Sequence, residues 1–173
     1  MRNDAGFTLI EMLIVVAVIG VIAAIGIPSV LRARVSANES SAIASLRAIS
    51  TAEATYFAHA GTSGYAGSLA TLARSCPGGT QPFISPDLAF DPSLKSGYTV
   101  GLQASATAQP SRPDCNGTAT DSDFYATAEP VSHGNTGVRA FATNNRGSIY
   151  YDQTGVAPTE AAMLPSGGGR VIE

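Results

Sequence analysis

Residues 6–31 read GFTLIEMLIVVAVIGVIAAIGIPSVL. From Phe7 to Leu31 there are 25 residues, and Glu11 is the one charge among them. A helix of that length rises about 37 Å, which is enough to cross a hydrocarbon core of about 30 Å. A secretory signal peptide has a shorter apolar core, of about 7 to 15 residues, that ends at a small-residue cleavage site. This run is longer and ends in Pro28 and Arg32, so it predicts a membrane-spanning helix.

Glu11 is a carboxylate at the entrance of this apolar run. An ionisable residue inside a spanning segment is costly unless it is paired, so it marks a functional site and predicts a cationic partner. Glu11 also lies only four residues into the run, which fits a position at the membrane interface. The spacing alone leaves both interpretations open.

The composition of the whole chain narrows the functional classes. The 173 residues, typical of one domain, are 45% hydrophobic and 13% charged, with a net charge of -3. The single lysine, Lys95, and the lack of a basic run argue against nucleic acid as a main partner, because phosphate neutralisation needs clustered Lys and Arg. The two histidines stand alone and no catalytic motif is present. We predict neither an enzyme nor a bound cofactor.

Beyond Leu31 the chain continues to read as helix as far as His59. No Pro or Gly occurs there until Gly61, which suits a helix C-cap. Apolar residues recur at a spacing of three to four, which predicts a stripe that packs on a sheet. These residues are Val35, Ile43, Leu46, Ile49, Tyr56 and Phe57. A helix over residues 7–59 measures roughly 80 Å, so its first half needs lipid or copies of itself as cover.

The second half of the chain is rich in Gly and Pro and contains four strand-like runs. They cover residues 97–102, 124–128, 138–143 and 148–151. Asn144, Asn145 and Gly147 predict a hairpin between the last two, because Asn and Gly accept positive φ. Residues 75–96 read as irregular, and residues from Thr154 onward read as a loose tail. The predicted fold is α+β, a long N-terminal helix packed on a small antiparallel sheet of about four strands.

The N-terminal residues also carry a family resemblance. Residues 6–11, GFTLIE, then the apolar run, Pro28 and a long polar helix, resemble the prepilin motif of the type IV pilin and pseudopilin superfamily. The resemblance implies that a prepilin peptidase cuts between Gly6 and Phe7 and methylates the new amino group of Phe7. It divides the chain into a leader (1–6), a membrane and filament-core helix (7–31), an amphipathic helix (32–60) and a region of loops, sheet and tail (61–173).

The resemblance also implies roles for single residues. Glu11 pairs with the N-terminal amine of Phe7 in a neighbouring subunit. Gly20, Gly26 and Pro28 break helix preference, and the resemblance implies that this part of the helix unwinds when the subunit leaves the bilayer. A simple proline kink, or close helix approach at the glycines, explains the same residues.

The implied function is that of a structural subunit of a pilus or pilus-like filament. Its partners are other copies of the chain, the prepilin peptidase, the inner-membrane assembly machinery and, before assembly, the lipid bilayer. It would cross the bacterial inner membrane once, with the C-terminal domain outside the cytoplasm, and end in an extracellular pilus or a periplasmic pseudopilus. The alternatives are a pseudopilin of a type II secretion system and a monomeric membrane-anchored binding module.

The second half of the chain also contains two cysteines and a group of three aspartates. Cys76 and Cys115, in loops of a domain outside the cytoplasm, predict a disulfide, with two free thiols as the alternative. Asp114, Asp121 and Asp123 lie in one loop and offer oxygen ligands of the kind that calcium prefers. Their spacing matches no fixed calcium pattern, so we predict a solvated acidic loop and no metal site.

Overall fold

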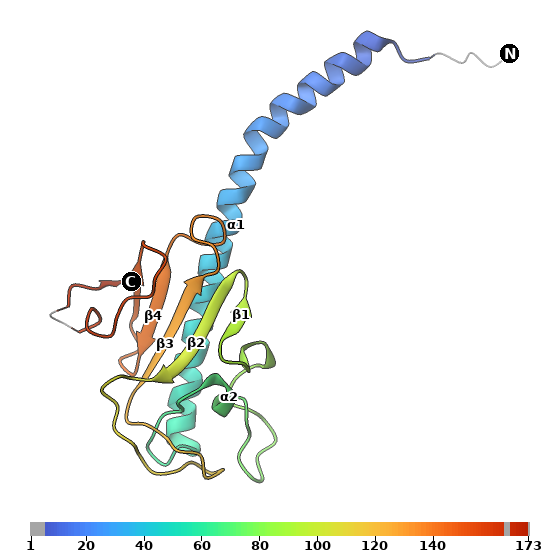
Figure 1. The fold of residues 1–173 in the computed structure, drawn as a ribbon. Coiled ribbons are helices and arrows are strands. Elements are labelled where there is room, and N and C mark those ends of the chain that lie inside the picture. The colour runs from blue at the N-terminus through green and yellow to red at the C-terminus, as the bar shows by residue number, and fades with distance from the viewer. Residues whose placement is uncertain (1–5, 165–166, 173) are drawn as a thin grey trace. The chain divides into compact units, whose positions relative to one another are not determined.

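A computed structural model describes residues 6–164 and 167–172 of the chain. The chain divides into two compact units, one that ends at Arg34 and one that begins at Val35. Helix α1 (Leu9–His59) contributes to both units and closely matches the predicted helix, as Figure 1 shows. Of the predicted leader, residues 1–5 lie outside the described residues.

The first unit consists of the N-terminal part of α1. Its apolar side chains have no cover within the chain, since the most apolar 18-residue window has a mean hydropathy of 2.8 and is 0% buried. Pro28 lies inside the helix, which continues on both sides of it. This helix is therefore long and apolar enough to cross a membrane.

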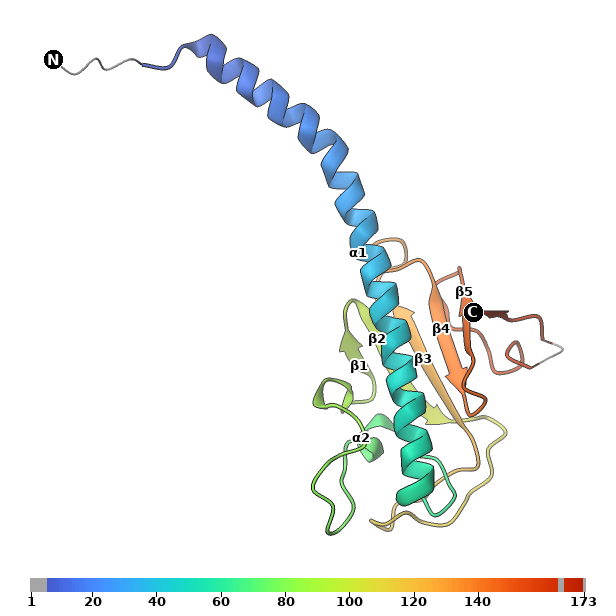
Figure 2. The same cartoon turned by 180° about the vertical axis from the view of Figure 1, so that it is seen from behind.

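The second unit contains an antiparallel sheet of six strands in sequence order. The strands are β1 (Ser93–Lys95), β2 (Tyr98–Ala104), β3 (Phe124–Pro130), β4 (Ala140–Asn144), β5 (Ile149–Asp152) and β6 (Arg170–Val171). Figure 2 shows the second half of α1 lying across one face of this sheet. The α+β prediction is confirmed, but the number of strands is six and not four, because two short edge strands were missed.

The central strands are the ones that the sequence predicted. In β3 and β4, Ala126 is opposite Thr143, and in β4 and β5, Thr143 is opposite Ile149. The predicted hairpin is present, with the Gly147 N–H donating to the Asn144 carbonyl at 3.0 Å and a φ of 76° at Gly147. The stretch predicted to be irregular, 75–96, contains the short helix η1 (Pro86–Leu88) and β1.

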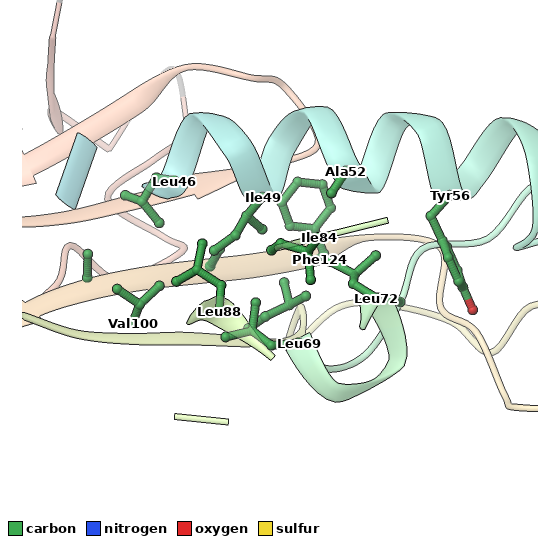
Figure 3. Packing of buried hydrophobic residues seen from close by; sticks show 14 of the residues in the cluster. Leu46, Ile49, Ala52, Tyr56, Leu69, Leu72, Ile84, Leu88, Val100 and Phe124 are labelled. Carbon is green, nitrogen blue, oxygen red and sulfur yellow. The ribbon is translucent and has the colours of Figure 1, made fainter. Parts of the chain in front are cut away.

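The core of the second unit lies between α1 and the sheet and is shown in Figure 3. Helix α1 contributes Leu46, Ile49 and Tyr56, and helix α2 (Leu69–Leu72) contributes both of its leucines. Phe57 was predicted on the same stripe, but it is 36% exposed and packs on the Tyr65 ring at a centroid distance of 4.8 Å. Adjacent residues on a helix point about 100° apart, so Tyr56 and Phe57 cannot both face the core.

The C-terminal residues are not the loose tail that was predicted. Ala157 and Met163 are buried and pack with Ala142 of β4. The Tyr125 hydroxyl donates to the Pro158 carbonyl at 2.7 Å, and β6 pairs with β5. Composition misled here because a segment rich in Gly, Pro and Thr can still be anchored by a few buried side chains.

Candidate functional site

The start of α1 brings Thr8 and Glu11 together. The backbone N–H and the hydroxyl of Thr8 both donate to Glu11 Oε2, at 2.9 Å and 2.6 Å, and the Glu11 N–H donates to Thr8 Oγ1 at 3.3 Å. This reciprocal pattern is a capping box, which satisfies N–H groups that a helix leaves unpaired at its start. Its signature, Thr8-x-x-Glu11, was present in the sequence and was missed.

Glu11 has no cationic partner within the described part of its own chain. The two salt bridges there join Lys95 to Asp87 and Arg139 to Glu39. The next charged residue along α1 is Arg32, about 30 Å further at 1.5 Å per residue. The capping box occupies Oε2, while Oε1 accepts no hydrogen bond from residues 6–164 or 167–172.

Gly6 and Phe7, the residues on the two sides of the expected cut, precede α1. Phe7 is 78% exposed, and an added Cβ at Gly6 would meet nothing within 4 Å. No described residue of the chain covers Gly6 or Phe7.

Gly20, Gly26 and Pro28 are all helical. An added Cβ at either glycine would meet nothing within 4 Å, so neither glycine is required by packing inside the chain. Within one copy of the chain, the effect of Gly20 and Gly26 is therefore a lower helix preference than other residues would give. The implied unwinding of this part of α1 stays a prediction.

The predicted disulfide is confirmed. Cys76 and Cys115 are joined with a Cα–Cα distance of 5.5 Å across a sequence separation of 39. Next to it, the Tyr56 hydroxyl donates to Asp114 Oδ2 at 2.8 Å and the Cys115 N–H donates to the Ala60 carbonyl at 3.0 Å. The C-terminal end of α1 is thus tied to the loop that carries the second cysteine.

The three aspartates considered as calcium ligands have separate partners. Asp114 is buried, and its Oδ1 accepts the N–H groups of Asn116 and Thr118. Asp121 exchanges backbone hydrogen bonds with Tyr65, and Asp123 Oδ1 accepts the Phe124 N–H at 2.7 Å. Across the described ranges no three His, Cys, Asp or Glu side chains lie close enough to hold one metal ion.

Comparison with known proteins locates the similarity in this N-terminal region. A family model for the prokaryotic N-terminal methylation motif matches residues 1–27. The N-terminal segment therefore has the sequence of a prepilin-type methylation motif, the class that the resemblance predicted.

Two curated relatives share this segment. The type IV major pilin protein PilA of Myxococcus xanthus is 45% identical over 55 residues, which cover 32% of this chain and 25% of the relative. The type IV wide pilus major component PilA4 of Thermus thermophilus is 59% identical over 39 residues, 22% of this chain and 30% of the relative. The matches thus span less than a third of either relative, and no solved structure matches the chain.

Proposed function

We propose that the chain is a structural subunit of a type IV pilus or pilus-like filament. The observation that carries the proposal is the methylation motif over residues 1–27 on a helix whose apolar window is entirely uncovered within the chain. Apolar surface of this extent is unstable in water and requires lipid or protein cover. The membrane provides that cover for the precursor, and stacked copies of α1 provide it in the filament.

Processing creates the cation that Glu11 lacks. In this proposal a prepilin peptidase cuts between Gly6 and Phe7 and methylates the amino group of Phe7. A methylated amine keeps its positive charge, as methylated lysine does. The cut therefore places a cation at the N-terminus, four residues before the carboxylate.

Assembly then pairs these charges between neighbouring subunits. Each subunit brings one N-terminal amine and one Glu11 carboxylate. In a homopolymer the positive charges of the amines therefore balance the negative charges of the carboxylates. Glu11 Oε2 already accepts two hydrogen bonds from Thr8, which leaves Oε1 to accept from the incoming amine. A subunit added at the wrong height would leave both charges unpaired in a low-dielectric environment, which is costly, so the pair sets the axial register.

The precursor would cross the inner membrane once, with the second unit outside the cytoplasm. The Cys76–Cys115 disulfide supports this side, because disulfides persist in oxidising compartments. The segment from Gly20 to Pro28 would lose part of its helical structure as the subunit leaves the bilayer. This change would extend the subunit without breaking contacts between helices.

The test is expression in a bacterium that has a prepilin peptidase and a pilus machinery, followed by shearing of surface filaments. Mass spectrometry is expected to find a chain that begins with methylated Phe7. A mature chain that still begins at Met1 would contradict the processing step. Filaments confined to the periplasm would indicate a secretion pseudopilus, and a membrane protein that never polymerises would indicate a monomeric anchor.

A pair of variants tests the role of Glu11 separately. Glu11→Ala is expected to insert into the membrane at the normal level and to yield no filament, because the amine then has no partner. Met12→Leu, which changes the next residue and adds or removes no charge, is the matched control and is expected to assemble normally. Normal filament yield from Glu11→Ala would disprove the pairing.

A further inference from the structure

Glu53 is a carboxyl group buried in the core of the second unit. It lies on α1 and is 0% exposed. The Ala66 N–H donates to Glu53 Oε2 at 2.9 Å, whereas Oε1 is buried without a hydrogen-bond partner among the described residues. A buried polar atom without a partner is costly, and it is far more costly when it carries a charge.

No cation among the described residues compensates for this burial. The charge of an ionised Glu53 acts on two nearby phenols, those of Tyr56 on α1 and Tyr65 in the loop after it, and raises the pKa of each. Further out, Asp114 and Arg74 act on Tyr56, and Asp123 acts on Tyr65. Burial therefore raises the pKa of Glu53 to about 8, against the opposing effect of the Ala66 hydrogen bond.

The segment that Glu53 binds is the turn after α1, residues 61–66. Thr62 and Ser63 have positive φ values of 47° and 72°, which cost free energy in residues with a side chain. The far end of the turn is held by the paired backbones of Tyr65 and Asp121 and by the bond from Ala66 to Glu53. Two side chains of α1 thus hold the end of this turn against the helix: Glu53 through the Ala66 N–H, and Phe57 through the Tyr65 ring at a centroid distance of 4.8 Å.

We propose that Glu53 is a proton-controlled contact, which keeps the turn of residues 61–66 closed on α1 while it is protonated and lets the turn open when the proton is lost. In the closed form an ionised Glu53 would have one hydrogen bond and no counter-ion. Opening of the turn admits water to the carboxylate. Alkaline conditions therefore favour the open form.

Hydrogen exchange at the Ala66 amide tests this proposal, with the full chain in detergent micelles over a range of pH. In the open form Glu53 ionises near its usual pKa of about 4.3. The protection factor of Ala66 is therefore expected to fall about tenfold per pH unit between about pH 5 and pH 8, and to level off above that.

Two variants separate the role of Glu53 from general effects. Glu53→Gln keeps the shape of the side chain and the acceptor for the Ala66 N–H but does not titrate. In this variant the protection factor of the Ala66 amide is expected to be independent of pH. Glu129→Gln is the matched control, because Glu129 Oε1 also accepts a backbone N–H, that of Ala157 at 2.8 Å, in another part of the unit. The control is expected to keep the slope of the original chain at Ala66.

Parallel profiles for the original chain and Glu53→Gln would overturn the proposal. If Glu53→Gln does not fold, the carbon-13 shift of the Glu53 carboxyl group in the original chain gives the answer directly. A carboxyl titration well above pH 4.5, together with a fall in Ala66 protection over the same pH range, supports the proposal. A titration near pH 4.5, or Ala66 protection that does not change with pH, overturns it.

Discussion

Glu39 on α1 and Arg139 next to β4 form the most extensively bonded ion pair among the described residues. The Arg139 Nε and Nη2 groups both lie 2.8 Å from Glu39 Oε2. Glu39 Oε1 accepts the N–H groups of Val138 and Arg139 at 2.9 Å and 3.0 Å. Burial tends to raise the pKa of Glu39, but these hydrogen bonds and the Arg139 charge together lower it below its usual value.

Glu39→Gln is expected to lower the free energy of unfolding by about 1 to 3 kcal/mol at pH 7, because charge-assisted bonds are lost while Arg139 stays in place. The partial exposure of Arg139 keeps the effect below that of a fully buried pair. Since the folded-state pKa of Glu39 is lowered, its contribution is present above about pH 4.5 and disappears as the pH falls below that. Urea unfolding of the original chain and of Glu39→Gln, at pH 7 and at pH 3, measures the loss of unfolding free energy at each pH. Equal losses at the two pH values would refute a contribution from ionised Glu39.

Arg139→Lys is expected to be less stable than the original chain but more stable than Arg139→Ala. Lysine keeps the charge but lacks the planar fork, and the Arg139 guanidinium also lies 5.5 Å from the ring centroids of Phe141 and Tyr151. In urea unfolding, the midpoint of Arg139→Lys should lie between those of the original chain and Arg139→Ala. A midpoint equal to that of the original chain would show that the fork and the stacking contribute nothing.

Thr8→Val is expected to loosen the first turn of α1. It removes the hydroxyl that donates to Glu11 Oε2 and accepts from the Glu11 N–H, while the backbone bond remains. Loss of an N-cap costs about 0.5 to 2 kcal/mol, so exchange of the amides in the first turn should rise by roughly 2- to 30-fold. Nuclear magnetic resonance in micelles measures it, and Thr8→Ser, which keeps the hydroxyl, should restore slow exchange. Failure of serine to restore it would rule out the capping box as the cause.

Replacement of both cysteines by serine is expected to lower the free energy of unfolding by about 4 kcal/mol. The estimate follows from the chain entropy of the loop that the disulfide closes, with a separation of 39 residues. Thermal unfolding of the variant measures the loss, and reduced original chain should unfold at the same temperature as the variant. A reductant that lowers the variant's own midpoint would point to an effect unrelated to the disulfide.

Gly137→Ala is expected to lower the free energy of unfolding by about 1 to 3 kcal/mol through overpacking. An added Cβ would clash with the Tyr98 hydroxyl, which donates to the Arg139 carbonyl at 2.7 Å. Gly101→Ala is the control, since its Cβ would meet Thr127 Oγ1 at 3.6 Å, an ordinary contact. Denaturant unfolding compares the two, and similar midpoints would contradict the steric argument.

Much of the fold could be predicted from local patterns. Strands β2 to β5 could be found because each has alternating or β-branched residues next to clear turn signals, such as Asn144 to Gly147. The edge strands β1 and β6, at three and two residues, are too short to show any period. The packing of Ala157 and Met163 depends on contacts with distant β4, which no local pattern records.

The candidate site divides in the same way. The disulfide could be predicted because Cys76 and Cys115 are the two cysteines of one domain. Glu11 could be singled out because a charge in an apolar run is unusual, and its role stays a prediction. The burial of Glu53 was missed, although Glu53 lies four residues after Ile49 and three before Tyr56, on the apolar stripe of the helix. The local sequence does not show that the turn of residues 61–66 supplies its hydrogen bond, from the Ala66 N–H.

The buried state of Glu53 also changes the electrical charge of the folded chain. The formal net charge of -3 counts every glutamate as ionised. With a pKa of about 8, Glu53 keeps its proton at pH 7, and the folded protein is then one charge less negative, at -2. Folded and unfolded chains of identical covalent structure should therefore differ in isoelectric point, with the folded chain focusing at the higher pH.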